Sequence, residues 1–312
     1  MAICLFEYAT YFGIKKINPS LAIEGLGMFK SLLNGFEKIM KVNTSISDDI
    51  CLFKQYPRKC RFEDILEKSE YALVIAPESE KELYNLTKKA EKYCNNLGSS
   101  SKAIRIAGDK WLSYKRLKSF MPKTEIFKGS TKLDFPLIAK PRNGCGCEGI
   151  IMIKKEKDLN KVPNGYILQE FVEGKPYSAS FIIGDEITRI STQTQEIRNF
   201  KYRGARIPVE IEDYILEEAL SKIKGLFGYV GIDFIVGEEG IRIIEINARA
   251  TTPIIAFKHV YGINVSELIF NNYYREEIPK IKSKNKIIIK KRYGKGNFIS
   301  LGGYSISIEA GK

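Results

Sequence analysis

The segment NGCGCEG, residues 143–149, constrains the fold more than any other, because it carries the G-x-G-x-x-G spacing of a dinucleotide-binding turn. Such a turn runs directly into a helix, whose N-terminus holds the pyrophosphate. Here the loop runs instead into GIIMIKK, 149–155, an isoleucine-rich segment that is typical of a strand. Glu170 stands where a ribose-binding acid is expected, about 20 residues on, but the helix is missing. The sequence therefore argues against a nicotinamide-binding enzyme.

What remains is a glycine loop between two strands. The first strand, FPLIAKP at 135–141, has Lys140 near its end. Because glycines carry no Cβ, the backbone N–H groups of such a loop can close over phosphate groups. Lys140 adds a positive charge for the same anion. The pattern predicts a triphosphate site, which commonly shares a divalent metal with its phosphates.

Ligands for that metal are predicted within VGIDFIVGEEGIRIIEINARA, residues 230–250. A three-residue hairpin loop at 238–240 would place Asp233 opposite Glu245. Asn247, two residues further on, shares a face with Glu245. Acids that face each other across a strand pair repel, and a buried carboxylate pair needs a compensating cation. Oxygen ligands of this kind suit Mg²⁺.

Residues 1–105 alternate between strand-like and helix-like segments, which predicts a parallel α/β layer. The expected strands are 2–6, 71–75 and 103–107, and the expected helices are 20–34, opened by a Pro19-Ser20 cap, and 79–95. Asp109 is expected to cap a further helix. Later strands are predicted within 135–172, 177–196, 230–236, 241–247 and the tail, with helices at 214–227 and 263–274.

Fifty Lys+Arg against 37 Asp+Glu give a net charge of +13, which attracts nucleic acids and nucleotide phosphates alike. The excess is dispersed, and its densest stretch, 280–296, is expected to be a solvated strand edge protected by lysine. His259 is the only histidine, which argues against Ser-His-Asp catalysis. Six cysteines without a C-x-x-C pair indicate reduced thiols, with Cys145 and Cys147 as small residues of a tight loop.

The cellular location is inferred from what the chain lacks. At 44% hydrophobic residues the sequence is that of a globular protein rather than a disordered one. Its apolar runs fall short of the roughly 18 residues that a membrane helix needs. The start, MAICLFEYATYFGIKK, has no basic n-region of a signal peptide. We therefore expect a cytoplasmic protein without a membrane partner.

Five segments, taken in order, resemble the ATP-grasp superfamily of carboxylate–amine ligases over about residues 105–275. They are DKWLSYKRL at 109–117, FPLIAKP at 135–141 with the glycine loop, YILQEFVEG at 166–174, GIDFIV at 231–236 and IIEINAR at 243–249. The resemblance implies an α/β (α+β) chain with the ATP-grasp fold. An N-terminal parallel α/β domain, 1–105, is then followed by two α+β subdomains that enclose ATP. These are 106–173 for the nucleotide and 174–312, including the basic tail, for metal and substrate.

The resemblance also implies a role for each matching residue. It implies that Lys140 and Lys110 contact the ATP phosphates, which the loop with Gly144, Gly146 and Gly149 covers. It implies that Glu170, Phe171 and Val172 line the adenine and that Glu173 reaches the ribose. It also implies that Mg²⁺ or Mn²⁺ is held by Asp233, Glu245 and Asn247, with Arg249 near the transferred phosphate. Many relatives have a ribose-binding acid just after the hinge glycine. Here that stretch is Gly174-Lys175-Pro176, which leaves the ribose ligand open.

The chemistry implied is activation of a carboxylate by phosphorylation, with release of ADP, followed by displacement of phosphate by an amine. Positioning and charge neutralisation carry such a reaction, so no protein nucleophile is required. The basic loop 198–210 carries Arg203 and Arg206, a candidate cradle for an anionic amino acid or the acyl phosphate. Arginine suits that role because its fork pairs with two oxygens. A solvated basic loop is the alternative.

Three N-terminal segments, EYATYFG at 7–13, SLAIEGLGMFKSLLN at 20–34 and IAPESEKELYNLT at 75–87, resemble the tyramine–glutamate ligases of methanofuran biosynthesis. This implies joining of the glutamate γ-carboxylate to tyramine, with an amino acid and an amine as partners and no nucleic acid. Homo-oligomerisation stays open. The alternatives are another ATP-grasp amino-acid or peptide ligase, such as a dipeptide-forming one, a basic nucleic-acid-binding protein, and a non-catalytic ATP sensor. The complete metal-ligand set argues against the sensor.

Overall fold

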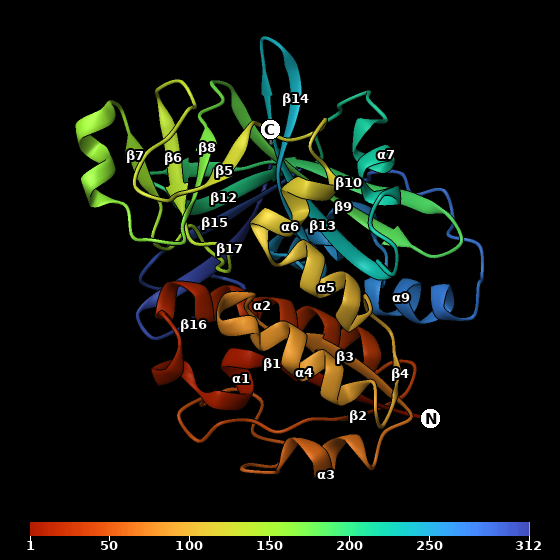
Figure 1. The fold of residues 1–312 in the computed structure, drawn as a ribbon. Coiled ribbons are helices and arrows are strands. Elements are labelled where there is room, and N and C mark those ends of the chain that lie inside the picture. Colours follow the sequence, from red (N-terminus) through yellow and green to blue (C-terminus); the bar gives the residue numbers. More distant parts are fainter. Residues whose placement is uncertain (312) are drawn as a thin grey trace.

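The computed structural model describes residues 1–311 and arranges their strands in four sheets (Figure 1). The N-terminal sheet has the order β2-β1-β3-β4 and is parallel throughout. Its strands are β1 (Ala2–Glu7), β2 (Lys41–Asn43), β3 (Tyr71–Ile75) and β4 (Asn95–Asn96). The helical segments of this region are α1 (Tyr8–Phe12), η1 (Ile14–Lys16), α2 (Pro19–Phe36), α3 (Phe62–Leu66), η2 (Ser79–Lys81) and α4 (Glu82–Ala90). The predicted parallel layer is confirmed.

Helix α2 is the longest helix of this region and forms because its start is capped and one side is apolar. The Asn18 side chain accepts a hydrogen bond from the Ser20 N–H, and Pro19 takes the first helical position, where its missing N–H costs nothing. The cap is therefore Asn18, and the predicted Pro19-Ser20 cap was one residue too late.

The predicted strand at 103–107 is wrong. Residues Ser101–Ala107 form helix α5, because the Ser100 side chain accepts a hydrogen bond from the Ala103 N–H and caps the first turn. The short apolar run AIRIA fits a strand and a buried helix equally well, so the capping serine decides between them. Asp109 caps the next helix, α6 (Lys110–Arg116), as predicted.

The second sheet has the order β5-β8-β6-β7 and is antiparallel. It consists of β5 (Thr124–Ile126), β6 (Leu137–Lys140), β7 (Ile151–Ile153) and β8 (Ile167–Glu170), with η3 (Glu156–Lys161) between the last two. The glycine loop thus joins two neighbouring antiparallel strands, which confirms the absence of a helix after it.

Two further sheets follow. One has the order β10-β9-β13-β14, built from β9 (Lys175–Ile183), β10 (Ile187–Thr194), β13 (Gly228–Gly237) and β14 (Gly240–Asn247). The other has the order β11-β12-β15-β17-β16, built from β11 (Glu196–Arg198), β12 (Lys201–Ile207), β15 (Ile287–Tyr293), β16 (Ile299–Leu301) and β17 (Tyr304–Ala310). Helical segments here are α7 (Ile215–Ser221), η4 (Thr252–Ala256), α8 (Phe257–Tyr261) and α9 (Val265–Tyr273). Helix α7 ends earlier than the predicted 214–227.

The basic tail is not a solvated strand edge. Strand β15 lies inside its sheet, between β12 and β17, and Lys291 on it is buried beside Glu24 of α2. Strands β16 and β17 also contact α2 (Figure 1). The tail therefore closes back onto the N-terminal region.

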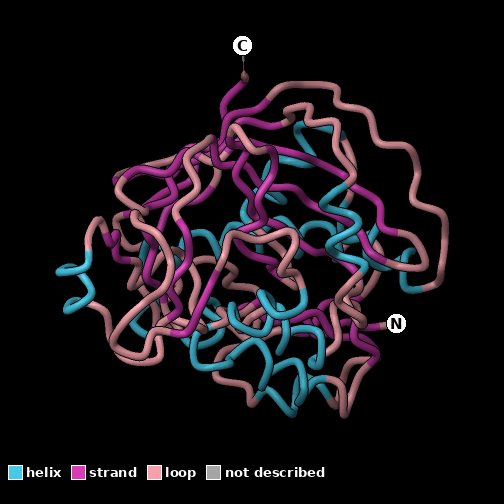
Figure 2. The backbone as a smooth tube through the Cα atoms, turned by 45° about the horizontal axis from the view of Figure 1, so that its top comes forward, coloured by secondary structure: helices cyan, strands magenta, loops and turns pink. Residues whose placement is uncertain are grey.

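The hydrophobic core runs across regions that are far apart in the sequence. One cluster joins Ile3 of β1, Leu26 of α2, Ile289 of β15 and Ile306 of β17. Figure 2 shows helices prevailing at the bottom of the molecule, with the C-terminus among strands at the top. The predicted division at residues 105 and 173 stays a prediction, because the clusters cross both positions.

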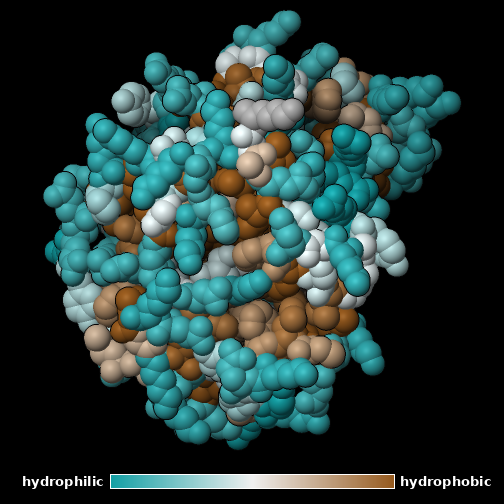
Figure 3. All heavy atoms as spheres, turned by 180° about the vertical axis from the view of Figure 1, so that it is seen from behind, coloured by the Kyte–Doolittle hydropathy of each residue, from teal (hydrophilic) through white to brown (hydrophobic). Residues whose placement is uncertain are grey.

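The surface mixes polar and apolar side chains. Hydrophilic residues cover much of the rear face and interrupt the apolar ones (Figure 3). Among residues 1–311, no helix combines the length and the apolar character needed to cross a membrane.

Close approach between β12 and β15 yields a test of the tail's position. A Cβ on Gly204 would lie 2.0 Å from the Ile289 carbonyl oxygen, a backbone atom that cannot move aside. We expect Gly204→Ala to destabilise the fold by about 1–3 kcal/mol, as overpacking does, and to lower the melting temperature. Gly98→Ala is the matched control, since its Cβ would meet its nearest neighbours at 3.5 Å. Equal melting temperatures for the two variants would contradict the β12–β15 pairing.

Candidate active site

A cavity of about 270 Å³ lies where the N-terminal region, the glycine loop and strands β13 and β14 meet. Most of the predicted phosphate and metal residues line it: Lys110, Lys140, Gly144, Gly146, Asp233, Glu245, Asn247 and Arg249. The remaining predicted residues are absent from its lining: Gly149, Glu170, Phe171, Val172, Glu173, Arg203 and Arg206. The structure thus brings together the polar residues of four separate sequence motifs.

Asp233 pairs with Glu245 across β13 and β14, as predicted, although the turn differs from the expected one. Gly237 pairs with Gly240, so the loop has two residues rather than three. The register then shifts between Asp233 and Phe234, where Ile244 is an extra residue on β14. This bulge restores the Asp233–Glu245 pair, and bulges commonly re-aim side chains near active sites.

The two carboxylates differ in their partners. Asp233 accepts hydrogen bonds from the Gln195 and Asn247 side-chain nitrogens at 2.8 and 3.1 Å. Burial, followed by the nearby Glu245 charge, raises the pKa of Asp233 to about 7. Glu245 lies 3.5 Å from the Lys110 ammonium. Gln195, which lies between β10 and β11, was missed from the sequence because nothing in its local pattern distinguishes it from its neighbours.

Two lysines line the cavity together with the glycine loop. The Lys140 ammonium is buried and donates to Gln169 Oε1 at 2.9 Å. Burial, followed by the charge of Lys110, lowers the pKa of Lys140 to about 8. Lys110 donates to the Gly144 carbonyl at 2.8 Å, so it links the glycine loop to Glu245. A burial of this depth sets Lys110 apart from an ordinary surface lysine.

Arg249 is held by an acid that sequence reasoning missed. Its Nε and Nη2 atoms donate to the two carboxylate oxygens of Glu78 at 2.8 and 2.9 Å, and Nη1 donates to the Ala250 carbonyl. Burial opposes the charge of Arg249, but Glu78 outweighs it and raises the pKa further above its usual range. Glu78 follows β3, about 170 residues before Arg249 in the chain.

The glycine loop closes the cavity against α2. Gly146 has a φ of +62°, and a Cβ there would come within 2.3 Å of Leu21 Cδ2. Asn18 donates to Glu148 at 3.3 Å, a second contact between helix start and loop. Both the backbone conformation and the space at position 146 favour glycine.

The cysteines of the loop are neutral thiols. Burial raises the pKa of Cys145 to about 12 and that of Cys147 to about 11. All six cysteines are free, as the prediction of reduced thiols required.

The predicted adenine hinge lies outside the cavity lining. Glu170 pairs with the Lys123 ammonium at 3.2 Å along the β5–β8 edge, and Phe171 is 40% exposed. Arg203 and Arg206 are exposed. Tyr202, the second residue of β12, lines the cavity instead. The adenine, ribose and substrate-cradle roles of these residues stay predictions.

Comparison with known proteins agrees with this geometry. A family model described as an ATP-grasp domain matches residues 107–253, and one for a pre ATP-grasp domain matches 52–104. A tyramine–L-glutamate ligase from Methanocaldococcus fervens is 36% identical and covers 92% of this chain and 100% of its own length. The chain belongs to the ATP-grasp ligases.

Two more relatives extend the match. A tyramine–L-glutamate ligase from Methanocaldococcus jannaschii is 34% identical over 92% of this chain and 94% of its own length. The crystal structure of an ATP-grasp superfamily protein from Archaeoglobus fulgidus superimposes with a TM-score of 0.87 at 36% identity, covering both chains fully. This ATP-grasp ligase is therefore an ATP-dependent enzyme that joins an acid to an amine.

The raised pKa of Asp233 makes stability depend on pH in the metal-free ligase. The folded state keeps the Asp233 proton up to about pH 7, whereas an unfolded chain loses it near pH 4. The folded state thus binds more protons between these values, and the free energy of unfolding falls as pH rises through them. Asp233→Asn removes this loss, so with EDTA the variant should melt at a higher temperature than the wild type at pH 8.

The difference in melting temperature should shrink towards pH 4, where the wild-type carboxyl is protonated in both states. Asp185→Asn is the control, because Asp185 is exposed and pairs only loosely with Arg275 at 3.8 Å. If the difference in melting temperature between Asp233→Asn and the wild type did not change with pH, this would contradict the raised pKa of Asp233.

Proposed function

We propose that this ATP-grasp ligase joins the γ-carboxylate of glutamate to the amine of tyramine, with ADP and phosphate as the other products. The observation that carries the proposal is the 36% identity to a tyramine–L-glutamate ligase over nearly the whole of both chains. Such an extent leaves little room for a different substrate-binding region. The reaction belongs to methanofuran biosynthesis, as the resemblance of the N-terminal segments implies.

The reaction proceeds in two steps. The glutamate carboxylate attacks the γ-phosphorus of ATP, and the bond to the bridging oxygen breaks to release ADP. The amine then attacks the acyl carbon, phosphate leaves with the electron pair of the C–O bond, and the amine proton passes to solvent. Lys110, Lys140 and Arg249 neutralise the phosphate charge, which is the main task in phosphoryl transfer.

A divalent cation fits the carboxylate side of the cavity. Asp233 and Glu245 supply carboxylate oxygens, and Asn247 adds an amide next to them. No group of three or more His, Cys, Asp and Glu side chains in residues 1–311 is placed so that it could hold a metal ion by itself. A cation here would therefore rely on two carboxylates, the amide and phosphate oxygens, which is the way Mg²⁺ is commonly held. Mn²⁺ accepts the same donors.

Small molecules are the proposed partners. The cationic lining residues Lys110, Lys140 and Arg249 gather inside the cavity, where they suit the phosphates of a nucleotide. The surplus surface charge is dispersed along the chain rather than gathered in a nucleic-acid motif. A dipeptide-forming reaction uses the same chemistry, so the amine decides between the two ligase functions.

Product analysis tests the proposal. With ATP, Mg²⁺, glutamate and a panel of amines, we expect ADP and a tyramine-dependent amide detected by mass. Glu245→Gln removes one of the two carboxylates and should lower ADP formation by about a hundredfold or more, the scale of losing a key electrostatic group. AMP as the product would rule out the acyl-phosphate route, and ADP with a different amine would discard tyramine.

Glu239→Gln is the matched control for this test. Glu239 lies in the turn of the same hairpin, and its side chain is 87% exposed. It should leave ADP formation unchanged, which separates the loss of a cavity carboxylate from a general effect on the β13–β14 hairpin.

A further inference from the structure

One face of α2 forms a wall of the cavity. Leu21, Glu24, Gly25 and Met28 all line it. They follow at intervals of three, one and three residues, the spacing that puts side chains on one side of a helix. Leu21 and Glu24 are half-buried, and Met28 is 6% exposed. The helix therefore offers the cavity an apolar stripe that carries a single carboxylate.

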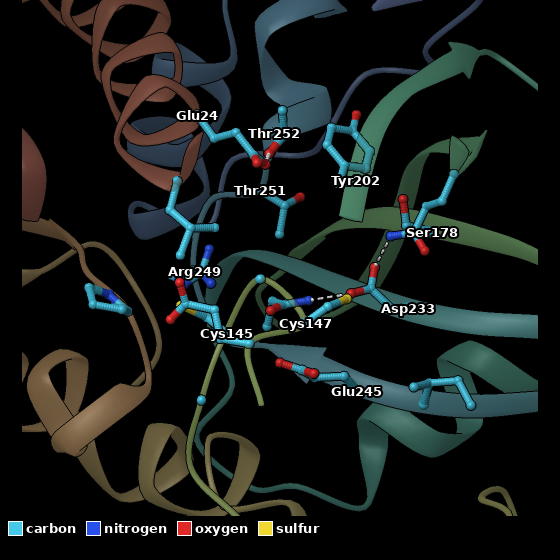
Figure 4. A pocket seen from close by; sticks show the side chains of 18 of the residues that line it. Glu24, Cys145, Cys147, Ser178, Tyr202, Asp233, Glu245, Arg249, Thr251 and Thr252 are labelled. Carbon is cyan, nitrogen blue, oxygen red and sulfur yellow. Dashed lines mark hydrogen bonds between the residues drawn. The ribbon is translucent and has the colours of Figure 1, made fainter. Parts of the chain in front are cut away.

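The Glu24 carboxylate is held by two neighbouring side chains. One oxygen pairs with the Lys291 ammonium, and the other accepts from the Thr252 hydroxyl at 2.6 Å. Lys291 is only 4% exposed and also donates to the Ser20 carbonyl. A carboxylate has about four acceptor positions, so two remain after these contacts. Figure 4 shows Glu24 and Thr252 together on the opposite side of the cavity from Glu245.

The second carboxylate of the N-terminal wall, Glu7, is occupied by its own helix. Its oxygens accept from the Ala9 and Thr10 N–H groups and from the Thr10 hydroxyl. Gly25 packs against it so closely that a Cβ would lie 2.2 Å from Glu7 Oε1. Glu7 is thus a helix cap with one of its roughly four acceptor positions left, whereas Glu24 keeps two.

None of the α2 residues that line the cavity is cationic, whereas three cations line it elsewhere, together with Asp233 and Glu245. The cationic lining residues, Lys110, Lys140 and Arg249, are tied to the glycine loop, to Gln169 and to Glu78. An acid substrate and the phosphates need these cations. The α2 end presents an acid and apolar side chains instead, which suit a cationic group on an apolar body.

We infer that the α2 stripe is the subsite for the amine substrate. Glu24 accepts hydrogen bonds from the ammonium group of a primary amine, which gives one proton to solvent before its nitrogen attacks, and Leu21 and Met28 contact its apolar body. The assignment of this amine as the one joined to glutamate rests on the proposed function. The subsite itself rests on the cavity lining, the contacts of Glu24 and the distribution of charge.

The central experiment replaces the buried ion pair by a neutral pair in the double variant Glu24→Gln/Lys291→Met. Removing one charge alone would strand the other in the interior, which is strongly destabilising, whereas replacing both is tolerated better. Tyramine is titrated into the wild type and the variant by calorimetry. We expect the affinity for tyramine to fall by about ten- to a hundredfold, the range for one charge-assisted hydrogen bond.

The matched control is Glu309→Gln/Lys290→Met. Lys290 lies on β15, the strand that also carries Lys291, and its ammonium is 2.6 Å from the carboxylate of Glu309 on the neighbouring strand β17. Neither residue lines the cavity. This variant should bind tyramine as the wild type does. Equal affinity of the wild type and Glu24→Gln/Lys291→Met would overturn the inference.

A second variant leaves the ion pair intact and so guards against misfolding of the double variant. Leu21→Ala shortens the apolar wall, and it should weaken tyramine binding several-fold more than methylamine binding, because only tyramine has a body to contact the wall. An equal change for the two amines would mean that Leu21 acts only through its contact with Gly146 of the loop, and would overturn the apolar half of the subsite.

A third readout separates this inference from the proposed function. Hydroxylamine in place of tyramine attacks the acyl carbon, the bond to the phosphate oxygen breaks, and glutamyl hydroxamate and phosphate form. Absence of hydroxamate from the wild type would refute activation of glutamate, while the tyramine titration still decides the subsite. With hydroxamate formed, kcat/KM for tyramine relative to hydroxylamine should fall about ten- to a hundredfold in Glu24→Gln/Lys291→Met. An unchanged ratio would overturn the inference.

Discussion

The repulsion between Asp233 and Glu245 is the constraint around which the cavity is organised. Acids that face each other across a strand pair are destabilising, and burial raises the pKa of Asp233 to about 7. The surroundings offset part of this cost: Gln195 and Asn247 donate to Asp233, and Lys110 stands 3.5 Å from Glu245. Because each compensating group reaches only one of the two acids, the proposed cation would be the group that offsets the charge of both.

Two buried ion pairs compensate further charges at the cavity. Arg249 follows β14 and pairs with Glu78 of the N-terminal region, while Lys291 of the tail pairs with Glu24 of α2. Each pair joins segments that lie far apart in the chain. Removal of one partner from either pair would leave a buried charge without compensation. The packing of the N-terminal region against the rest therefore depends on the same residues that shape the cavity.

The sequence reveals those parts of the site that are encoded locally. The Asp233–Glu245 pair follows from two short strands and a tight turn. The turn was predicted one residue too long, but the extra residue Ile244 in the bulge leaves the two acids opposite each other. The glycine loop was recognisable because the segment after it is strand-like. The strand predicted at 103–107 failed because five apolar and basic residues carry no period, so the Ser100 cap decided for helix α5.

Long-range partners have no such local signal. Glu78 and Gln195 read as ordinary loop and strand residues, and Lys291 read as one more lysine of a basic tail. What gives them a role is the order of strands in space: β15 enters between β12 and β17, and this carries Lys291 to α2. A buried charge must find its partner, so once the topology is known, each buried lysine or acid points to a second residue. Lys291 and Glu24 form such a pair, although nothing in the sequence around either residue indicates the other.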